Sequence, residues 1–377
     1  MQPKNRLNEC ENKVNSNIDR VRSRPFRLTD DFVTLAHGSG GKASAALVEQ
    51  VFFDAYGNPV LAQGGDSGVV GLAEIVAAAG NDDPAEAMAG SVAFSTDSYV
   101  VNPIEFPGGD IGELAVNGTV NDLAVAGANP KVISAAFVLE EGLEITVLRR
   151  IVESMRHAAD KAGVTIVAGD TKVVPKGACD RMYITTAGVG FIPAGKEASY
   201  TNVAVGDRII VSGPIADHGM AVMMARGDLA MVAPIKSDTQ AVNGQVAALM
   251  AAAPNTRWMR DATRGGVATV MNELARGTGL GVVLDDEAIA VREMTRGACD
   301  MLGIDPLYVA NEGTFVAVVA ADEAETALAA LREAGAPEAC LIGRIEEQPA
   351  ASVVLVTGFG GTRMVDMLVG DPLPRIC

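Results

Sequence analysis

The chain has 377 residues, a formal net charge of −17 and 49% hydrophobic residues. An acidic balance of this size excludes non-specific binding to nucleic acid or to anionic lipid, because both require clustered Lys and Arg. No apolar run is long enough and free enough of charge to span a bilayer, and the first residues lack the apolar region of a signal peptide. These features predict a soluble cytoplasmic protein.

The sequence divides into four segments. Residues 1–31 are polar with little apolar periodicity, as expected for a disordered leader. We expect a first domain over 32–195, a second over 196–350 and a tail over 351–377. In both domains strands, then helices, then strands follow one another, which favours an α/β class built as α+β layers over a uniform βαβ alternation.

A glycine-rich loop over residues 37–42, with the sequence HGSGGK, opens the first domain and precedes a helical pattern. Backbone N–H groups in such a loop can hold an anion, and Lys42 adds positive charge. The GxxxxGK[ST] spacing of a P-loop is missing. An ordinary glycine turn therefore explains the loop equally well.

The next predicted strand covers residues 92–95 and runs into Asp97. A helix is predicted to begin at Asp110, because aspartate accepts hydrogen bonds from the free N–H groups at a helix start. This helix carries Asn121 and Asp122. Polar side chains therefore follow one strand and line one helix of the first domain.

An amphipathic helix is predicted over residues 144–161, between buried-type strands at 132–138 and 164–167. Its apolar residues recur at helical spacing. The second of these strands delivers Asp170 and Lys172 at its carboxyl end.

The second domain repeats the succession of strands and helices. A second glycine-rich segment, over residues 260–266, leads into a helix. Methionines in the helix that starts around Asp217 fit a core role better than a ligand site. The remaining predicted elements of both domains are strands over 182–191, 208–211, 282–284 and 314–319, and helices over 239–252, 266–276 and 322–334.

Four aspartates lie at or near the ends of predicted elements in the first domain: Asp66, Asp97, Asp122 and Asp170. Carboxylates that converge from several elements suit hard cations, and Mg²⁺ is usually held by one or two carboxylates together with substrate phosphates. Taken singly, each of them is better explained as a surface turn residue or a helix cap.

The chain ends in Leu-Pro-Arg-Ile-Cys, which places a thiol at Cys377. Pro374 removes a backbone donor, so this end resists joining a helix or an inner strand. A frayed end and a functional thiol are both consistent with these residues. The other cysteines have no CxxC spacing and fit small reduced core residues.

Taken together, these motifs resemble those of the HypE family, hydrogenase maturation proteins that make the nitrile ligand of the [NiFe] active site. The resemblance covers residues 32–377 and leaves out only the leader. The matching segments are 37–42 (HGSGGK), 94–101 (FSTDSYVV), 106–112 (FPGGDIG), 117–122 (NGTVND), 169–174 (GDTKVV), 259–267 (MRDATRGGV), 310–313 (ANEG) and 374–377 (PRIC).

The resemblance implies a fold, a reaction and partners. The fold is that of the aminoimidazole ribonucleotide synthetase superfamily, with two α/β domains, homodimerisation through a β-barrel of the first domains and a flexible C-terminal tail. A HypF-like carbamoyltransferase would place a carbamoyl group on Cys377, and ATP would drive dehydration of the S-carboxamide to an S-cyanate. The cyano group would then pass to iron on a HypC–HypD complex.

The resemblance also implies a site for ATP and Mg²⁺. Asp97, Asp122 and Asp170 would hold the metal, and Asp66 would join them at the nucleotide. Asn121 would help to orient the metal shell.

The phosphates of ATP would be held by Lys42 and Lys172. Lys172 would also act with Cys377 and Glu312 in the chemistry, with Glu312 as the base that deprotonates the carboxamide nitrogen. A structural role for Glu312 beside Gly313 is an equal alternative.

Other residues compete for these roles. His37 and His218 are alternative bases, although a histidine beside glycine is more often a hydrogen-bonding turn residue. Asp261 and Arg264 would shape the pocket that receives the tail, or would cap the following helix.

Two further functions fit parts of the sequence. One is a kinase or synthetase of the same superfamily that acts on a diffusible small substrate. Selenophosphate synthetases place a reactive Cys or Sec before the glycine-rich loop, where this chain has Ala36 and His37. The other is a non-enzymatic scaffold that carries a thiol-bound group between partners.

Overall fold

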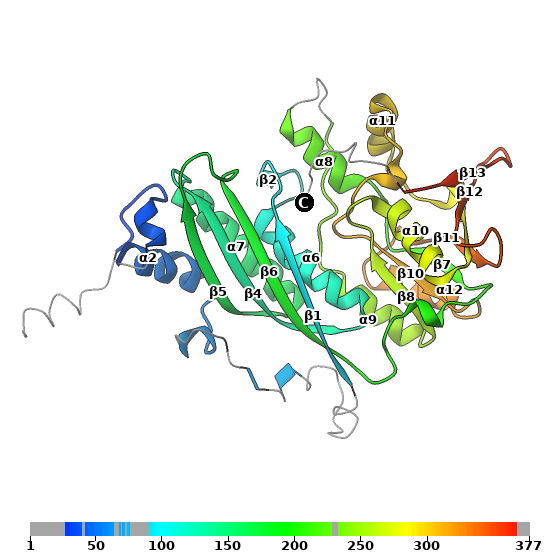
Figure 1. Cartoon of the computed structure of the whole chain (residues 1–377), viewed down its shortest axis with the longest axis horizontal. Helices are drawn as coiled ribbons and strands as arrows, with labels where there is room; N and C mark the ends of the chain where they lie inside the picture. The colour runs from blue at the N-terminus through cyan, green and yellow to red at the C-terminus, as the bar shows by residue number, and fades with distance from the viewer. Residues whose placement is uncertain are drawn as a thin grey trace, which may run out of the picture.

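The computed structural model describes residues 27–39, 42–63, 68, 70–71, 74–75, 90–227 and 233–367. Most of the expected leader, together with Asp66 and Cys377, lies outside the described residues. The described chain forms two units that lie side by side, each built around its own sheet (Figure 1). None of the helices in these ranges is both long and apolar enough to cross a membrane.

The first unit is a four-stranded sheet covered on one face by two long helices (Figure 1). Its strand order is β1 (Ser91–Tyr99), β6 (Met182–Ile192), β4 (Asn129–Glu140) and β5 (Thr165–Val174). Only the β4–β5 pair is parallel among these strands. The helices are α6 (Ile111–Val125) and α7 (Ile145–Ala162), and a small hairpin of β2 (Glu105–Phe106) and β3 (Gly109–Asp110) precedes α6. Strands β1 and β5 are thus the two edges of this sheet.

The start of α6 confirms the predicted cap at Asp110, and the end of α7 follows a local rule of helix termination. The Asp110 carboxylate accepts hydrogen bonds from the N–H groups of Gly112 (2.8 Å) and Glu113 (3.1 Å), which satisfies two free donors at the start of α6. Helix α7 ends at Gly163, whose φ of 70° lies in the left-handed region that glycine adopts without strain.

Short helical segments from the N-terminal part of the chain pack beside the β5 edge and against α7 (Figure 1). They are η1 (Leu35–Gly38), α2 (Lys42–Leu47), η2 (Val48–Phe53), α3 (Asp54–Tyr56) and η3 (Leu61–Gln63). The predicted glycine-rich loop covers the end of η1 and the first residue of α2, with its two central glycines outside the described residues.

The second unit is a seven-stranded sheet. Its order is β13 (Thr362–Val365), β12 (Val353–Val356), β9 (Gly281–Asp285), β11 (Cys340–Glu346), β7 (Arg208–Val211), β10 (Phe315–Val319) and β8 (Thr256–Asp261). Its longer helices are α8 (Asp217–Arg226), α9 (Asn243–Ala252), α10 (Gly266–Thr278), α11 (Glu293–Leu302) and α12 (Ala324–Glu333). Three single turns complete the unit: η4 (Tyr200–Asn202), η5 (Asp286–Ala288) and η6 (Pro306–Tyr308).

The structure differs from two of the predictions made from the sequence. The expected tail over 351–377 begins too early, because β12 and β13 join the sheet, and Val353 and Leu355 are fully buried. The helix expected over 239–252 begins only at Asn243. The residues before it form an extended segment whose backbone bonds to the first unit, and this segment contributes to the site described below.

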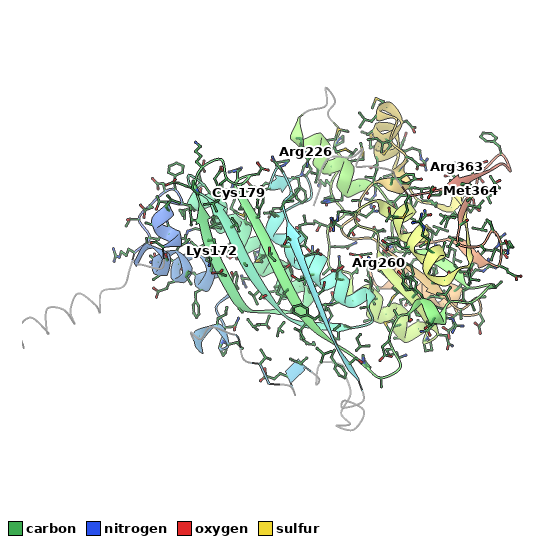
Figure 2. The ribbon with its side chains drawn as sticks, in the orientation of Figure 1. Lys172, Cys179, Arg226, Arg260, Arg363 and Met364 are labelled. Atoms are coloured by element: carbon green, nitrogen blue, oxygen red, sulfur yellow. The ribbon has the colours of Figure 1, made fainter. Side chains whose placement is uncertain are left out.

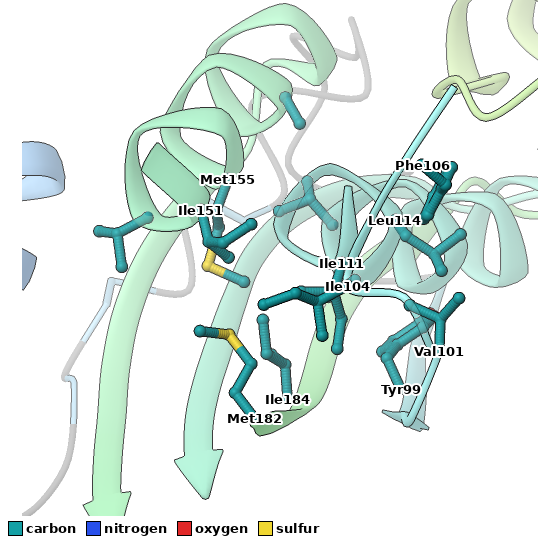
Figure 3. Packing of buried hydrophobic residues seen from close by; sticks show 14 of the residues in the cluster. Tyr99, Val101, Ile104, Phe106, Ile111, Leu114, Ile151, Met155, Met182 and Ile184 are labelled. Atoms are coloured by element: carbon teal, nitrogen blue, oxygen red, sulfur yellow. The ribbon is translucent and has the colours of Figure 1, made fainter. Parts of the chain in front are cut away.

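The largest core lies between the first sheet and its two helices (Figure 3). Side chains from the strands, from α6 and α7, and from the loop before α6 meet there. Those that are almost completely buried include Val101, Ile104, Ile111, Leu114, Ile151, Met155, Met182 and Ile184. This packing fixes the position of α6, which carries several of the predicted site residues.

A substitution in this core tests how strongly it stabilises the protein. Phe137 is 1% exposed and its ring centroid lies 4.8 Å from that of Phe52. Phe137→Ala should lower the free energy of unfolding by about 3–5 kcal/mol, because it removes buried apolar surface and leaves a cavity. Urea denaturation measures this, with Phe359→Ala as the control. Phe359 is fully exposed, so its substitution should change stability by less than about 0.5 kcal/mol. Similar values for both variants would contradict the expectation.

Candidate active site

Four carboxylates gather where the two units meet. Asp97 comes from β1, Asp122 from α6, Asp261 from the end of β8 and Glu312 from the loop before β10. Each of Asp97, Asp261 and Glu312 has its pKa raised by burial and by neighbouring members of this group. We call these residues the acidic cluster.

Strand β1 presents three polar side chains to α6, because alternate residues of a strand share a face. Ser95 Oγ donates to Asp122 Oδ2 at 2.6 Å, and the Tyr99 hydroxyl donates to Asp97 Oδ2 at 3.3 Å. A Cβ at Gly118 would lie 2.1 Å from that hydroxyl, so only glycine leaves room for Tyr99. Two hydroxyl groups thus orient two of the cluster's carboxylates. The alternation around Asp97 was the available sequence signal for both.

Asp261 is 8% exposed. Burial, with smaller contributions from Asp122 and Asp97, raises its pKa to about 7, while Arg260 opposes the shift. Asp261 was expected to shape a pocket or cap a helix. Its position in the cluster makes it a third carboxylate, whose pKa is raised by the charges of Asp97 and Asp122.

Glu312 is 3% exposed. Burial first, then the charges of Asp261, Asp238 and the two remaining cluster aspartates, raise its pKa well above the ordinary value. A carboxyl group whose pKa is raised in this way binds a proton more readily than an ordinary one, which makes Glu312 a candidate for proton transfer.

The electrostatics of the cluster favour a cation. Arg264 lies close enough to lower the pKa of Asp97 and is itself exposed. It stands in the turn that starts α10, where Gly266 has a φ of 58° and a Cβ would lie 2.5 Å from the Leu307 carbonyl oxygen. Carboxylates are the ligands that Mg²⁺ prefers. Within the described ranges, however, no three His, Cys, Asp or Glu side chains are already arranged as a metal site.

Asn121 joins the two units. Its Nδ2 donates to the Gln240 carbonyl oxygen (2.9 Å) and to the Glu312 carbonyl oxygen (3.3 Å), and its Oδ1 accepts from Val242 N (2.8 Å). The side chain is 2% exposed. Both polar atoms of its side-chain amide are therefore hydrogen-bonded to backbone groups of Glu312 and of residues 240 and 242. From the sequence, this amide was expected to help orient a metal shell.

Asp170 and Lys172 lie apart from the acidic cluster in a single chain. Lys172 Nζ forms an ion pair with Asp170, and hydrogen bonding from Lys172 is the main cause that lowers the pKa of Asp170. In the register of the sheet Asp97 is level with Gly169, whereas Asp170 is level with Ser98. The two aspartates therefore point to opposite faces, roughly 14 Å apart across the sheet. Figure 2 places Lys172 on the first sheet, well away from Arg260, the sequence neighbour of Asp261.

A cavity of about 380 Å³ opens beside this second pair. Its walls combine aromatic side chains of the N-terminal helices with polar residues of β5. Lining residues include Gly38, Phe52, Phe53, Tyr56, Asp170 and Lys172. Lys42, expected at the phosphates, begins α2 in the same region.

Neither histidine proposed as an alternative base belongs to the acidic cluster. His37 is 2% exposed, and its Nδ1 accepts from Thr34 N at 2.9 Å, as expected for a turn residue. His218 is buried, with Nδ1 2.8 Å from Ser237 Oγ and its ring edge-on to Phe106.

The raised pKa of Asp261 predicts a pH effect on stability. The pKa is about 7 in the folded chain against 3.8 for an unperturbed aspartate, so between these values the folded chain holds a proton that the unfolded chain has released. The free energy of unfolding therefore falls as the pH rises through this window. Asp261→Asn should remove this loss and exceed the unmodified protein by about 1–3 kcal/mol at pH 8.

Urea denaturation in a metal chelator, at the acid end of this pH window and at pH 8 above it, measures the effect of Asp261→Asn. At the acid end the two proteins should differ little, because Asp261 is then protonated and uncharged. Asp286→Asn, on the exposed turn η5, is the control. An unchanged pH slope in Asp261→Asn would contradict the expectation.

Comparison with known proteins identifies the family. The models for AIR synthase related proteins match residues 64–192 (N-terminal domain) and 204–356 (C-terminal domain). The carbamoyl dehydratase HypE of Rhodobacter capsulatus is 50% identical over 353 residues, which covers 93% of this chain and 99% of the relative. That of Escherichia coli (strain K12) is 42% identical over 346 residues, covering 92% and 99%.

Solved structures agree with these relatives. A hydrogenase maturation protein HypE in complex with ATP matches with a TM-score of 0.83 and 42% identity, covering 91% of this chain and 99% of that one. A HypE–HypF complex matches with a TM-score of 0.72 and 41% identity, covering 86% and 100%. The chain therefore belongs to the HypE family of carbamoyl dehydratases, hydrogenase maturation proteins with the AIR synthase related fold.

Proposed function

We propose that the chain is an ATP-dependent carbamoyl dehydratase that converts an S-carboxamide on its own Cys377 into an S-cyanate. Membership of the HypE family supports the reaction class. The observation that carries the proposal is the acidic cluster, in which four carboxylates lie near Arg264 and the pKa values of Asp97, Asp261 and Glu312 are raised by burial and by neighbouring carboxylates. Cys377 supplies the thiol that would hold the substrate.

The reaction needs the carboxamide oxygen to become a leaving group. Transfer of the γ-phosphoryl group of ATP forms a C–O–P linkage and releases ADP. Loss of both nitrogen protons and cleavage of the C–O bond then give S–C≡N and phosphate. Mg²⁺ would neutralise charge on the transferring phosphoryl group, and Asp97 and Asp122, with Asp261, offer the carboxylates that would hold it.

The chain's own groups would perform the remaining work. Glu312 would accept a proton from the carboxamide nitrogen, because a carboxylate whose pKa is raised by burial binds a proton more readily than an ordinary carboxylate. Arg264 would place positive charge at the phosphate. Burial of Glu312 would limit the access of water to the activated carboxamide.

Lys172 and Asp170 would act from a second copy of the chain. We propose a homodimer in which the uncovered faces of the first sheets meet and form a β-barrel. Strand β1 is an edge strand whose Phe94 and Val92 are 69% and 59% exposed on that face, and apolar surface of this kind favours association. Lys172, Asp170, Lys42 and Asp66 of one copy would then complete the nucleotide site of the other.

The proposal includes partners and a compartment. A HypF-like carbamoyltransferase would load Cys377, in line with the solved HypE–HypF complex of relatives. A HypC–HypD complex would accept the cyano group for the iron of a [NiFe] hydrogenase. The C-terminal tail would move between these partners and the site, in the cytoplasm.

The central prediction concerns mass. Full-length protein carbamoylated on Cys377 and given ATP and Mg²⁺ should lose one water mass at that residue, measured by intact mass spectrometry. Asp122→Asn should slow this loss by about 100-fold or more, because the proposed Mg²⁺ site would lose one of its carboxylates and the phosphoryl group would be held less well. Asp286→Asn serves as the control. Phosphate release with the carboxamide intact would contradict the proposed reaction. Turnover of a free substrate by protein that lacks residues 374–377 would favour a kinase.

A second prediction tests the shared site. Asp122→Asn and Lys172→Ala should each be inactive alone. When the two variants are unfolded, mixed and refolded, half of the dimers carry one of each. One of the two sites in such a dimer has both native residues, so activity should return to about a quarter of the unmodified level. The double variant Asp122→Asn/Lys172→Ala, unfolded and refolded alone, gives the control, because none of its dimers contains an intact site. No recovery would place both residues in one chain's site.

A further inference from the structure

The segment between α8 and α9 touches both units. We call residues 235–242 the linking segment. Ser237 N donates to the Pro107 carbonyl oxygen at 2.8 Å, and Asn117 Nδ2 donates to Thr239 Oγ1 at 3.2 Å. These contacts attach the segment to the hairpin and helix of the first unit.

On its other side the linking segment holds the loop that carries Glu312. The Asp238 carboxylate accepts hydrogen bonds from Glu312 N through Oδ1, and from Gly313 N and Thr314 Oγ1 through Oδ2, each at 3.0 Å. Three donors from three consecutive residues thus meet a single side chain. Hydrogen bonds to an ionised acceptor are among the stronger ones in proteins.

The close approach of the two segments explains Gly313. A Cβ at this position would lie 1.8 Å from the Asp238 carbonyl oxygen. No residue with a side chain fits while Asp238 keeps these contacts. The ANEG sequence therefore places a glycine where the linking segment crosses the loop.

The carbonyl side of Glu312 is held as well. Asn121 Nδ2 donates to the Glu312 carbonyl oxygen at 3.3 Å, and the same side chain bonds Gln240 and Val242 of the linking segment. Both backbone polar groups of Glu312 are therefore fixed by side chains that the linking segment places or contacts.

Such a restraint has a physical reason. Glu312 is 3% exposed beside Asp97, Asp122 and Asp261. Repulsion between carboxylates and the preference of a charge for water both favour a loop that turns Glu312 outward. A flexible loop would follow these forces, whereas a backbone held by three hydrogen bonds to Asp238 resists them.

We propose that Asp238 is a positioning residue that holds Glu312 in place for proton transfer, through the hydrogen bonds to residues 312–314. The inference rests on the proposed function of Glu312 as the base. The Asp238 carboxylate is occupied by these hydrogen bonds, so it would act through Glu312 and not directly on the nucleotide or the thiol. Its contribution is to keep the Glu312 carboxyl within reach of the carboxamide nitrogen.

Single-turnover water loss from the carbamoylated full-length protein tests the proposal. Asp238→Ala should slow water loss at saturating ATP by about 100-fold, the size of effect expected when a catalytic group is displaced by about 1 Å. The ATP concentration that gives half the maximal rate should change by less than about threefold, because Asp238 acts after nucleotide binding. Asp238→Asn keeps one acceptor oxygen and should recover part of the rate, to about tenfold below the unmodified protein.

Hydrogen exchange gives a readout that does not depend on turnover. The amides of Glu312 and Gly313 should exchange faster in Asp238→Ala, while amides of β4 keep their protection. Asp286→Ala is the matched control, an exposed aspartate of the same unit. Thr314→Val, which removes only the hydroxyl donor, should fall between the control and Asp238→Asn in rate.

The outcomes distinguish a failure of the positioning role of Asp238 from a failure of the proposed function. An unmodified rate or unchanged exchange in Asp238→Ala would overturn the positioning role. A variant Asp238→Ala that lost ATP affinity and melting temperature along with the rate would also overturn it, because Asp238 would then have a general structural role. If Glu312→Gln lost water at the unmodified rate, Glu312 would not be the base. The positioning role of Asp238 would then be wrong as well. If unmodified protein lost no water with ATP, the proposed function would fail, while exchange would still report whether Asp238 holds the loop.

Discussion

Burial of like charges at the junction of the two units is the constraint on which the site depends. Asp97, Asp122, Asp261 and Glu312 repel one another, and burial removes the water that would screen them. The fold holds them together through neutral donors and through packing of the helices and strands that carry them. This tension prepares a place for cations, because a metal ion or a positively charged side chain relieves it.

Helix α6 transmits this constraint between the units. Residues one turn apart share a face of a helix, and α6 uses two such pairs. Gly118 and Asp122 face β1, where Tyr99 and Ser95 contact them, whereas Asn117 and Asn121 face the linking segment. The core beneath the first sheet fixes the position of α6, so one face of the helix stays against β1 and the other against the linking segment. One element therefore aligns the nucleotide side of the proposed site with Glu312.

Much of the fold was predictable from local patterns. The apolar period of α7 and the Asp110 cap depend on neighbours in the sequence, and the structure confirms them. The strands predicted over 92–95 and 164–167 exist but continue to Tyr99 and Val174, so Asp97 and Asp170 lie within them and not after their ends. Two predictions were wrong: the start of α9, and the tail in place of strands β12 and β13. Contacts with distant segments of the chain determine both. The backbone of residues 240 and 242 bonds to Asn121, and β12 pairs in parallel with β9, far away in the chain.

The sequence by itself determined which chemical groups the protein carries and the family to which it belongs, because residue types and motif spacing need no partner strand. Only the tertiary structure decided which groups meet. Asp97 and Asp170 point to opposite faces because side chains alternate along a strand, and strand register sets which face each one takes. Asp238 holds no recognisable motif, and its role exists only because the linking segment crosses the loop of Glu312.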